Sequence, residues 1–571
     1  MINITNLKKD NKKAGTKKLK KISTARFTII AVILIVIFAI SLTPITLQND
    51  TFYTVKIGEH ILNNGINMQD PFSWHEGLSY TYPHWLYDVI TYLVYSIFNF
   101  QGVYITTCIL ASILGIAIYF VNSKISKNNI ISFFITIGVL YLIKGYITAR
   151  AQLATFILFI LAIYFIEMFL KNKKKGYAFG LVLISLLIVN LHCAVWPFYF
   201  VIFLPYIGEY LVAELSEIII FRKVKILILN LKTKFLIKKN ASKEQIKEVK
   251  DKLNQIIEKN EKIKIKRNKE LENPYKIRIT KNKNVKALIL VMIICVLMGF
   301  LTPLGTTPFT YLPDTMAGNT TKNINEHLPM TLADQTEVMC TLIIFLAILI
   351  FTKVKIKLSD LFMIGGLAYL MLASRRQLSM FAIIGSVILT KMIIELIESY
   401  TKNGIQNLKK IMIKPISLLI VIILVLSLSY NFFKEKENDK IISESTYPVQ
   451  ACDYILENID LENARFYNEY NYGSYMLYRG IPVFIDSRCD LYAPEFSGLS
   501  DDIFMDFIET SNISKFYEDT FKKYDITHVI TYKNSKMNMI IIKTQDINYK
   551  EIYSDSYFTI YERLSANEST D

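Results

Sequence analysis

Long uninterrupted runs of apolar residues are the main pattern of this chain. Stretches of roughly 20 residues recur between Arg26 and Tyr430, and short basic or polar segments separate them. Each stretch is long enough to cross the ~30 Å hydrocarbon core of a bilayer as a helix. The pattern therefore predicts a polytopic α-helical membrane protein, and it excludes a soluble cytosolic or secreted protein.

Individual spans can be placed along this pattern. The first is expected from Arg26 to Leu47 as an uncleaved span, because it is too long for a signal-peptide core and lacks a small-residue cleavage site. The stretch Trp85–Phe100 is shorter and carries Asp88, so we expect it to lie along the interface. Ten further spans make about eleven in all, at 102–121, 129–146, 152–170, 177–191, 195–214, 285–303, 336–352, 358–373, 377–397 and 412–431.

The distribution of charge indicates an orientation. The chain has 571 residues, 52% of them hydrophobic, and a net charge of +16. Residues 1–26 carry nine Lys/Arg and one Asp, residues 222–286 carry 22 Lys/Arg and seven Asp/Glu, and residues 435–571 carry 13 Lys/Arg and 25 Asp/Glu. Lys and Arg accumulate in cytoplasmic loops. We therefore expect a multi-pass plasma-membrane protein with a cytoplasmic N-terminus and an extracytoplasmic C-terminal segment. No nucleic-acid partner is expected, because base-stacking aromatics do not interleave the basic runs.

The same pattern divides the chain into regions. Residues 1–25 are a basic cytoplasmic tail, and 26–434 a transmembrane domain with an outer loop (48–101) and a basic cytoplasmic insert (222–284). Helical spacing of apolar residues in the insert predicts an amphipathic hairpin or surface helix attracted to anionic lipid. Residues 435–571 are expected to form an extracytoplasmic α/β domain, with strands at 464–470, 481–486 and 526–533, helices at 447–458, 502–511 and 515–524, and a hairpin at 549–563. Its two cysteines, Cys452 and Cys489, either form a disulfide with each other or remain free thiols.

Polar residues that carry chemistry gather on the expected outer side. In the loop NDTFYTVKIGEHILNNGINMQDPFSWHEGLSYTYPHWL (49–86), Asp50 directly follows the first span, and Asp70-Pro71 precedes an aromatic segment that returns to the membrane through His84. The expected topology adds Arg150, His192 and the pair Arg375/Arg376 to this side. Polar residues near membrane depth are costly and usually face a functional cavity. The outer side is therefore where a site is expected.

The loop resembles the first outer loop of GT-C glycosyltransferases, which take sugars from polyprenyl-phosphate carriers. That class includes protein O-mannosyltransferases, the aminoarabinose transferase of lipid A and the catalytic subunit of oligosaccharyltransferase. Further segments resemble a bacterial branch of the class with an outer α/β domain, namely ARAQLATF, NLHCAVW, TPLGTTPF, ASRRQLSMFA, NYGSYMLYRG and VFIDSRCDLY. The resemblance implies transfer of a sugar from a polyprenyl-phosphate or diphosphate carrier to a glycan, lipid or protein acceptor, with Asp50 at the catalytic position.

One departure from that class concerns metal binding. Members usually carry an acidic pair or an Asp-x-Asp-like pattern, whereas Thr51 follows Asp50 here. The sequence therefore leaves open whether a divalent cation takes part, and it identifies no metal ligand. No other cofactor is expected.

The chemistry of sugar transfer explains the residue types. The acceptor hydroxyl must lose a proton as it attacks the anomeric carbon, so a carboxylate serves as general base. Charge that develops on the leaving phosphate requires Arg, Lys, His or a metal ion. The expected catalytic residues are Asp50 and Asp70, and the expected substrate-binding residues are His84, Arg150, His192, Arg375 and Arg376.

Each candidate also has an ordinary structural interpretation. Asp50 is a common helix-capping residue type, and Asp70-Pro71 is typical of turns. The three arginines suit snorkelling to headgroups, and the two histidines suit interfacial or packing positions. Asp486 and Arg488 follow an expected buried strand, where they form either a structural ion pair or a substrate contact.

Two other functions compete with the transferase. A transporter or flippase predicts internal repeats and charged or broken helices at mid-membrane, and neither stands out in this chain. A non-catalytic GT-C-like scaffold, with an outer domain that binds partners, is compatible with the missing acidic pair.

Overall fold

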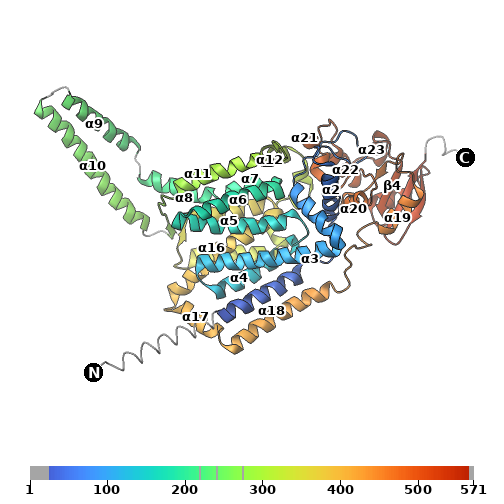
Figure 1. Cartoon of the computed structure of the whole chain (residues 1–571), viewed down its shortest axis with the longest axis horizontal. Coiled ribbons are helices and arrows are strands. Elements are labelled where there is room, and N and C mark those ends of the chain that lie inside the picture. The colour runs from blue at the N-terminus through green and yellow to red at the C-terminus, as the bar shows by residue number, and fades with distance from the viewer. Residues whose placement is uncertain (1–24, 218–219, 239–241, 273–275, 565–571) are drawn as a thin grey trace.

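The structure is a computed structural model that describes residues 25–217, 220–238, 242–272 and 276–564. The expected basic tail lies almost entirely outside these residues. The described chain is predominantly helical, with an elongated bundle of helices at the centre, a compact head at one end and a helical arm at the other (Figure 1).

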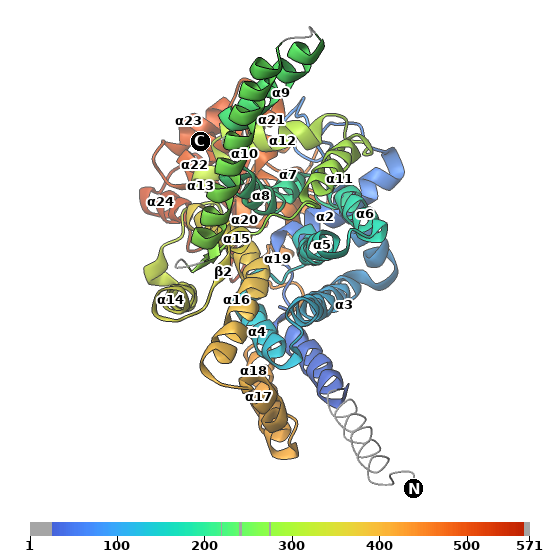
Figure 2. The same cartoon turned by 90° about the vertical axis from the view of Figure 1, so that its left-hand side faces the viewer.

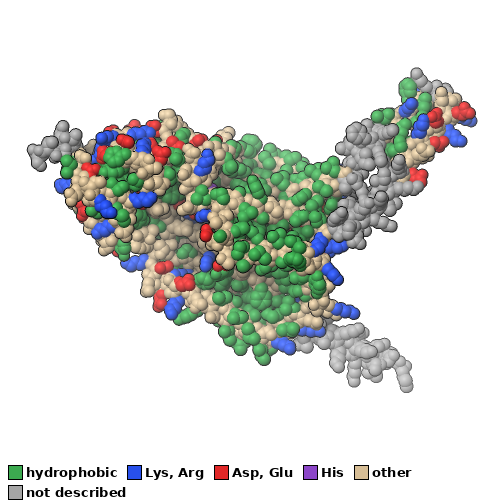
Figure 3. Space-filling view, turned by 180° about the vertical axis from the view of Figure 1, so that it is seen from behind, with side chains coloured by type: hydrophobic (Ala, Val, Ile, Leu, Met, Phe, Trp, Pro, Cys, Tyr) green, Lys and Arg blue, Asp and Glu red, His purple; other side chains and the backbone are tan. Residues whose placement is uncertain are grey.

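Apolar helices make up the bundle. Six are long and apolar enough to cross a membrane: Ala25–Leu42, Trp85–Ser126, Ala151–Asn172, Cys193–Leu215, Arg375–Tyr400 and Pro415–Glu435. Five shorter apolar helices accompany them, at Asn129–Leu142, Lys175–Leu191, Val285–Phe300, Thr336–Phe351 and Leu358–Ala373. Figure 3 shows a broad hydrophobic surface over the bundle, between a head rich in charged residues and a basic edge at the opposite end. The chain is a helical membrane protein.

Each expected span lies on one of these apolar helices, although the boundaries differ. In the order of the chain the bundle helices are α3 (Trp85–Ser126), α4 (Asn129–Leu142), α5 (Ala151–Asn172), α6 (Lys175–Leu191), α7 (Trp196–Val201), α8 (Leu204–Glu217), α11 (Val285–Leu297), α14 (Thr336–Phe351), α15 (Leu358–Ala373), α16 (Leu378–Tyr400), α17 (Gly404–Met412) and α18 (Pro415–Glu435). Seen along the bundle, α14 and α18 stand at its edge (Figure 2).

The stretch Trp85–Phe100 is the first part of α3 rather than a separate helix. At Asn99 the backbone leaves the helical region, with φ 54° and ψ −160°, which kinks α3 at that point. Before the kink, the Tyr95 hydroxyl lies 2.6 Å from the Tyr478 hydroxyl near the end of the chain. This part of α3 therefore packs with the head.

The head combines two segments that are far apart in the sequence. Residues 47–103 and residues 447–561 supply nearly all of one hydrophobic cluster, whereas the bundle helices form another. Phe52 lies near the centre, with its ring 5.3 Å from Phe100, 4.8 Å from Tyr447 and 5.0 Å from Tyr475, measured between centroids. The C-terminal segment therefore shares its core with the loop that follows the first helix.

Two helices in the head come into very close contact. Helix α2 (Asn49–Asn64) packs on α3, and a Cβ atom added at Gly58 would lie 2.2 Å from the backbone oxygen of Asp88. Only glycine permits that approach. Gly58 therefore helps to fix α2, and Asp50 with it, against the start of α3.

A small sheet lies at the far end of the head. Strands β3 (Phe466–Tyr467), β4 (His528–Tyr532), β6 (Phe558–Arg563) and β5 (Tyr549–Ser554) adjoin in that order, with β3 and β4 parallel and the other pairs antiparallel. The helices of the C-terminal head segment are α19 (Val449–Asn458), α20 (Tyr470–Tyr478), α21 (Pro494–Ser497), α22 (Ile503–Ser511), α23 (Tyr517–Lys523) and α24 (Lys536–Thr544). The expected strand at 481–486 is wrong: this segment is extended but joins no sheet, and Val483 instead bridges Ser73 of the other head segment.

The arm consists of α9 (Ile220–Lys238) and α10 (Lys243–Glu272), which pair as a hairpin and project from the end of the bundle opposite the head (Figure 1). Beside its base, β1 (Ile277–Arg278) pairs in parallel with β2 (Ile356–Lys357).

Cys452 and Cys489 are both free thiols, so the disulfide left open by the sequence does not form in this structure.

Candidate functional site

A large cavity lies where the head meets the bundle. Its volume is about 1250 Å³, and both head segments, the start of α5, the loop 311–329 and the segment before α16 line it. Of the seven residues expected to form the site, five line this head cavity: Asp50, His84, Arg150, His192 and Arg376. These residues are scattered over more than half of the chain, and the fold brings them to one place.

Asp50 lies in the first turn of α2 but does not cap the helix. The N-cap is Gln48, whose side chain makes no capping hydrogen bond. Asp50 Oδ2 instead lies 2.7 Å from Arg150 Nε, in an ion pair of partly exposed side chains. Within the described residues Asp50 Oδ1 accepts no hydrogen bond, so this oxygen is available to a ligand in the cavity.

Arg150 is held from a second side by Glu326. Its Nη1 donates to Glu326 Oε1 at 2.9 Å. Burial alone would raise the pKa of Glu326, but the positive charges of Arg150 and Arg376 hold this pKa below its ordinary value. Two carboxylates thus neutralise Arg150 and hold its guanidinium beside Asp50.

The loop that carries Glu326 is fixed to the head. Helix α12 (Thr307–Ala317) places the Tyr311 hydroxyl 2.6 Å from Asp490 Oδ2, and α13 (Thr320–Asn323) places the Thr320 hydroxyl 2.9 Å from Asp490 Oδ1. Both hydroxyls donate to the same carboxylate. The loop therefore forms one wall of the cavity and connects head to bundle.

Arg376 is an available cation of the cavity. Its backbone N–H donates to the Glu326 carbonyl at 2.9 Å, but its guanidinium makes no ion pair or hydrogen bond with any other side chain in the described part of the chain. Arg375, its neighbour, lies outside the cavity, with Nε donating to the Pro329 carbonyl at 3.3 Å. The expectation that one of the two arginines joins Asp50 and Arg150 thus singles out Arg376.

The two histidines lie side by side at the bundle end of the cavity. The rings of His84 and His192 are 4.8 Å apart, and His192 is 2% exposed. The Thr155 hydroxyl lies 3.1 Å from His192 Nδ1, whereas His192 Nε2 is buried without a hydrogen-bond partner among the described residues.

A second, apolar pocket of about 320 Å³ extends from this point into the bundle. Side chains from α5, α8, α15 and α16 line it, among them Phe156, Phe159, Met363 and Leu367. It shares seven residues with the head cavity, and we call this shared set the neck: Gln152, His192, Val195, Phe198, Leu370, Arg376 and Gln377. An apolar space inside the membrane bundle therefore adjoins a polar space at a neck that contains an available cation.

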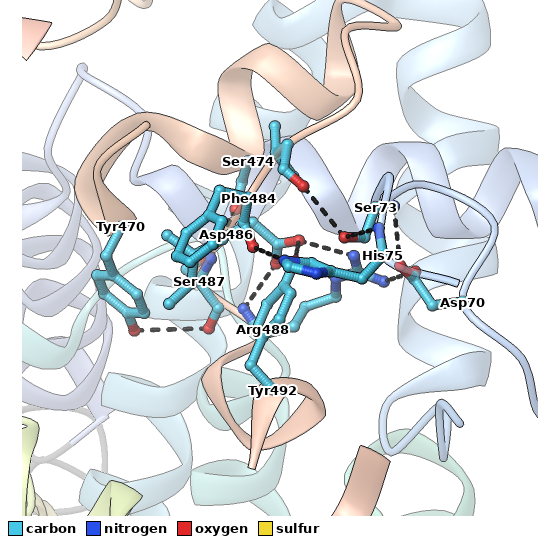
Figure 4. Close-up of polar contacts among 12 residues, drawn as sticks. Asp70, Ser73, His75, Tyr470, Ser474, Phe484, Asp486, Ser487, Arg488 and Tyr492 are labelled. Carbon is cyan, nitrogen blue, oxygen red and sulfur yellow. Dashed lines mark hydrogen bonds and ion pairs between the residues drawn. The ribbon is translucent and has the colours of Figure 1, made fainter. Parts of the chain in front are cut away.

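Asp70 does not line the cavity. Its carboxylate is buried, with Oδ1 2.6 Å from Arg488 Nη1, and Arg488 also donates from Nε and Nη2 to Asp486 at 2.9 and 2.7 Å (Figure 4). The Arg488 guanidinium lies 5.0 Å from the centre of the Tyr80 ring. Asp486 and Arg488 thus form a buried ion pair that Asp70 joins, and Arg488 also lines the head cavity.

The same network contains a neutral histidine. Burial lowers the pKa of His75 to about 4, and its Nε2 lies 3.0 Å from the Phe484 carbonyl (Figure 4). The Ser73 hydroxyl donates to the Val483 carbonyl at 3.1 Å. These contacts join the loop after α2 to the extended segment 481–488.

Sequence reasoning missed three carboxylates of the cavity, Glu326, Glu469 and Asp490. Glu326 lies in a loop with other acidic residues, and no local pattern distinguishes it from them. Glu469 precedes α20 and lines the cavity; burial raises its pKa to about 7, although the Thr531 hydroxyl donates to it at 3.3 Å. Its position just before a helix that packs on α2 was not visible in the sequence.

Clusters of metal-binding side chains are lacking in the described part of the chain, where no three His, Cys, Asp or Glu residues lie close enough together to hold a metal ion.

Comparison with protein-family models gives no match, and comparison with curated proteins gives none either. The site therefore has to be interpreted from its own geometry. It defines a polytopic helical membrane protein in which a polar head cavity and an apolar bundle pocket meet at a basic neck.

Proposed function

We propose that this protein is a membrane glycosyltransferase that moves a sugar from a polyprenyl-phosphate or diphosphate carrier to an acceptor in the head cavity. The observation that supports this most is that the apolar pocket and the head cavity lie against each other and share the neck residues. A lipid-linked sugar has an apolar chain, a charged phosphate and a polar sugar in this order. The pocket, the neck and the cavity offer complementary surroundings in the same order.

The phosphate is assigned to the neck. Arg376 is partly exposed there and has no carboxylate partner among the described residues, in contrast to Arg150. A guanidinium binds phosphate oxygens through charge-assisted hydrogen bonds. His84 and His192 lie beside it.

The transfer step uses Asp50 as general base. The acceptor oxygen forms a bond to the anomeric carbon, the bond from that carbon to the phosphate oxygen breaks, and its electron pair stays on the phosphate. The proton of the acceptor hydroxyl passes to Asp50, whose Oδ1 faces no other side chain at hydrogen-bond distance in the described chain. The acceptor is a glycan, lipid or protein hydroxyl.

This function places the head outside the cell, with about eleven spans and a cytoplasmic N-terminus. Two exposed positions test the orientation in a variant that lacks the exposed Cys340: Lys543→Cys in the head and Lys402→Cys at the other end of the bundle. A membrane-impermeant maleimide is expected to label Lys543→Cys in intact cells, and Lys402→Cys only after permeabilisation. The reverse pattern would exclude the proposed orientation.

The phosphate assignment predicts different results for two neighbouring arginines. Arg376→Gln should weaken binding of a polyprenyl monophosphate about 10- to 100-fold, because one charge-assisted contact is worth roughly 1.5–3 kcal/mol. Arg375→Gln is the matched control and should bind as the wild type does, since its side chain lies outside the cavity. Affinity is measured by titrating the lipid into purified protein in nanodiscs.

The outcomes separate the competing functions. If both variants bind the polyprenyl monophosphate as tightly as the wild type does, the phosphate does not bind in the neck. Tight binding without sugar transfer from any lipid-linked donor would favour the scaffold over the enzyme.

A further inference from the structure

His192 is a polar group of the neck with no assigned part in the proposed reaction. It follows α6, lines both the apolar pocket and the head cavity, and is 2% exposed. Its Nε2 is buried and has no hydrogen-bond partner in the described part of the chain. An unsatisfied buried polar atom costs free energy, so a ligand that satisfies it is expected in the neck.

The hydrogen bonds around His192 decide which nitrogen carries the proton. The Thr155 hydroxyl donates to the Ala151 carbonyl at 2.9 Å and has a single hydrogen to give. Towards His192 Nδ1, 3.1 Å away, the same hydroxyl therefore acts as an acceptor. The proton consequently lies on Nδ1, and the unpartnered Nε2 presents a lone pair to the neck.

The charged and titratable groups that face His192 favour this neutral state. They are His84, Arg376 and Arg150. Burial, with smaller contributions from these three, holds the pKa of His192 well below its ordinary value. The neck therefore contains one available guanidinium and one neutral imidazole whose buried Nε2 carries an unpartnered lone pair.

A phosphate dianion does not fit this arrangement, because its oxygens and Nε2 are all acceptors. One proton between them resolves the conflict. A phosphate monoester has its second pKa near about 6. The negative charge of a bound phosphate opposes the burial that lowers the pKa of His192, so phosphate and imidazole share one proton. Arg376 then supplies the remaining positive charge.

We infer that His192 Nε2 binds the phosphate of the lipid carrier and that this binding takes up one proton from solution. The inference rests on the proposed function, because it concerns the phosphate of the same carrier. The proton is held between Nε2 and a phosphate oxygen. During sugar transfer the electron pair of the broken bond passes to the phosphate, and the same proton offsets part of the new charge.

Isothermal titration of a polyprenyl monophosphate into the protein in phosphatidylcholine nanodiscs measures this proton directly. Titrations in two buffers of different ionisation enthalpy give the number of protons taken up. At pH 8, where the free lipid is a dianion, we expect about one proton per bound phosphate. At pH 5.5, where about three quarters of the free lipid already carries that proton, we expect uptake of only about a quarter of a proton. The affinity should fall about tenfold per pH unit above pH ~6.

Two variants locate the proton. His192→Gln keeps a side chain that can donate to a dianion, so proton uptake at pH 8 should disappear and the affinity should no longer depend on pH. His60→Gln is the matched control, since His60 lies on α2 outside both cavities, and it should behave as the wild type does. Thermal unfolding in detergent verifies that each variant is folded.

Each result has one meaning. Wild-type binding at pH 8 without proton uptake would overturn this inference and leave the proposed carrier intact, and this measurement needs no variant. Undiminished uptake in His192→Gln would assign the proton to another group and overturn the role of His192. No binding at any pH would overturn the proposed function and this inference with it.

Discussion

Asparagine in place of Asp50 is expected to lower the rate of sugar transfer by about 10²–10⁴-fold, the usual loss when a general base is removed. The amide keeps the size of the side chain, and Glu326 still holds Arg150. Because the Asp50–Arg150 pair is partly exposed, the loss of stability should be no more than about 1 kcal/mol. Turnover of purified protein is followed with a labelled polyprenyl-phosphate sugar, once the sugar that it uses has been found.

Two matched variants give this result its meaning. Glu59→Gln removes a carboxylate from the same helix outside the cavity and should leave turnover unchanged. Glu326→Gln removes the other partner of Arg150 and keeps Asp50, so a smaller loss is expected. Full turnover of Asp50→Asn would contradict the base assignment, and equal losses in Asp50→Asn and Glu326→Gln would show that neutralisation of Arg150 is what matters.

Methionine in place of Arg488 is expected to destabilise the head by about 3–5 kcal/mol. Asp70 and Asp486 have side chains that are 0% exposed, and Arg488 is their shared cation. Removing one partner of a buried ion pair leaves uncompensated charge in a medium that solvates it poorly. Hydrogen exchange of the backbone amides in residues 70–84 and 481–492 measures the loss, since these segments join at the network.

A second arginine of the head provides the control. Arg479 Nη2 lies 2.7 Å from Asp453 Oδ1, but the Asp453 side chain is 54% exposed. Arg479→Met should therefore cost about 1 kcal/mol or less. If Arg488→Met and Arg479→Met lose the same protection of backbone amides against hydrogen exchange, the buried Arg488 network stabilises the head no more than the exposed Arg479 pair does.

The sequence predicted the general location of the site better than its details. Apolar run length placed the helices, and placing Asp50, Arg150 and Arg376 at one end of the bundle anticipated their shared cavity. It did not distinguish Arg376 from Arg375, because both lie in one turn of 3₁₀ helix, where a step of one residue rotates a side chain by about 120°. Only the packing of that turn decides which arginine faces the cavity.

Long-range contacts account for the other differences. The sequence does not show that Arg488, 418 residues from Asp70, lies against the Asp70 carboxylate. The segment 481–486 has the apolar pattern of a buried strand, but pattern alone does not identify the partner, and its partner is Ser73 in another segment. The C-terminal segment likewise looked like a separate domain, because local patterns do not show that it shares a core with residues 47–103.

That shared core has a consequence for how the protein is made. A ribosome adds about 5–20 residues per second, so the 418 residues from Asp70 to Arg488 take roughly 20–80 s to synthesise. For that time the first head segment exists without the tyrosines that later pack against Phe52. The newborn chain thus carries an unfinished apolar surface through most of its synthesis, and a messenger truncated before residue 447 yields a product with that surface permanently uncovered.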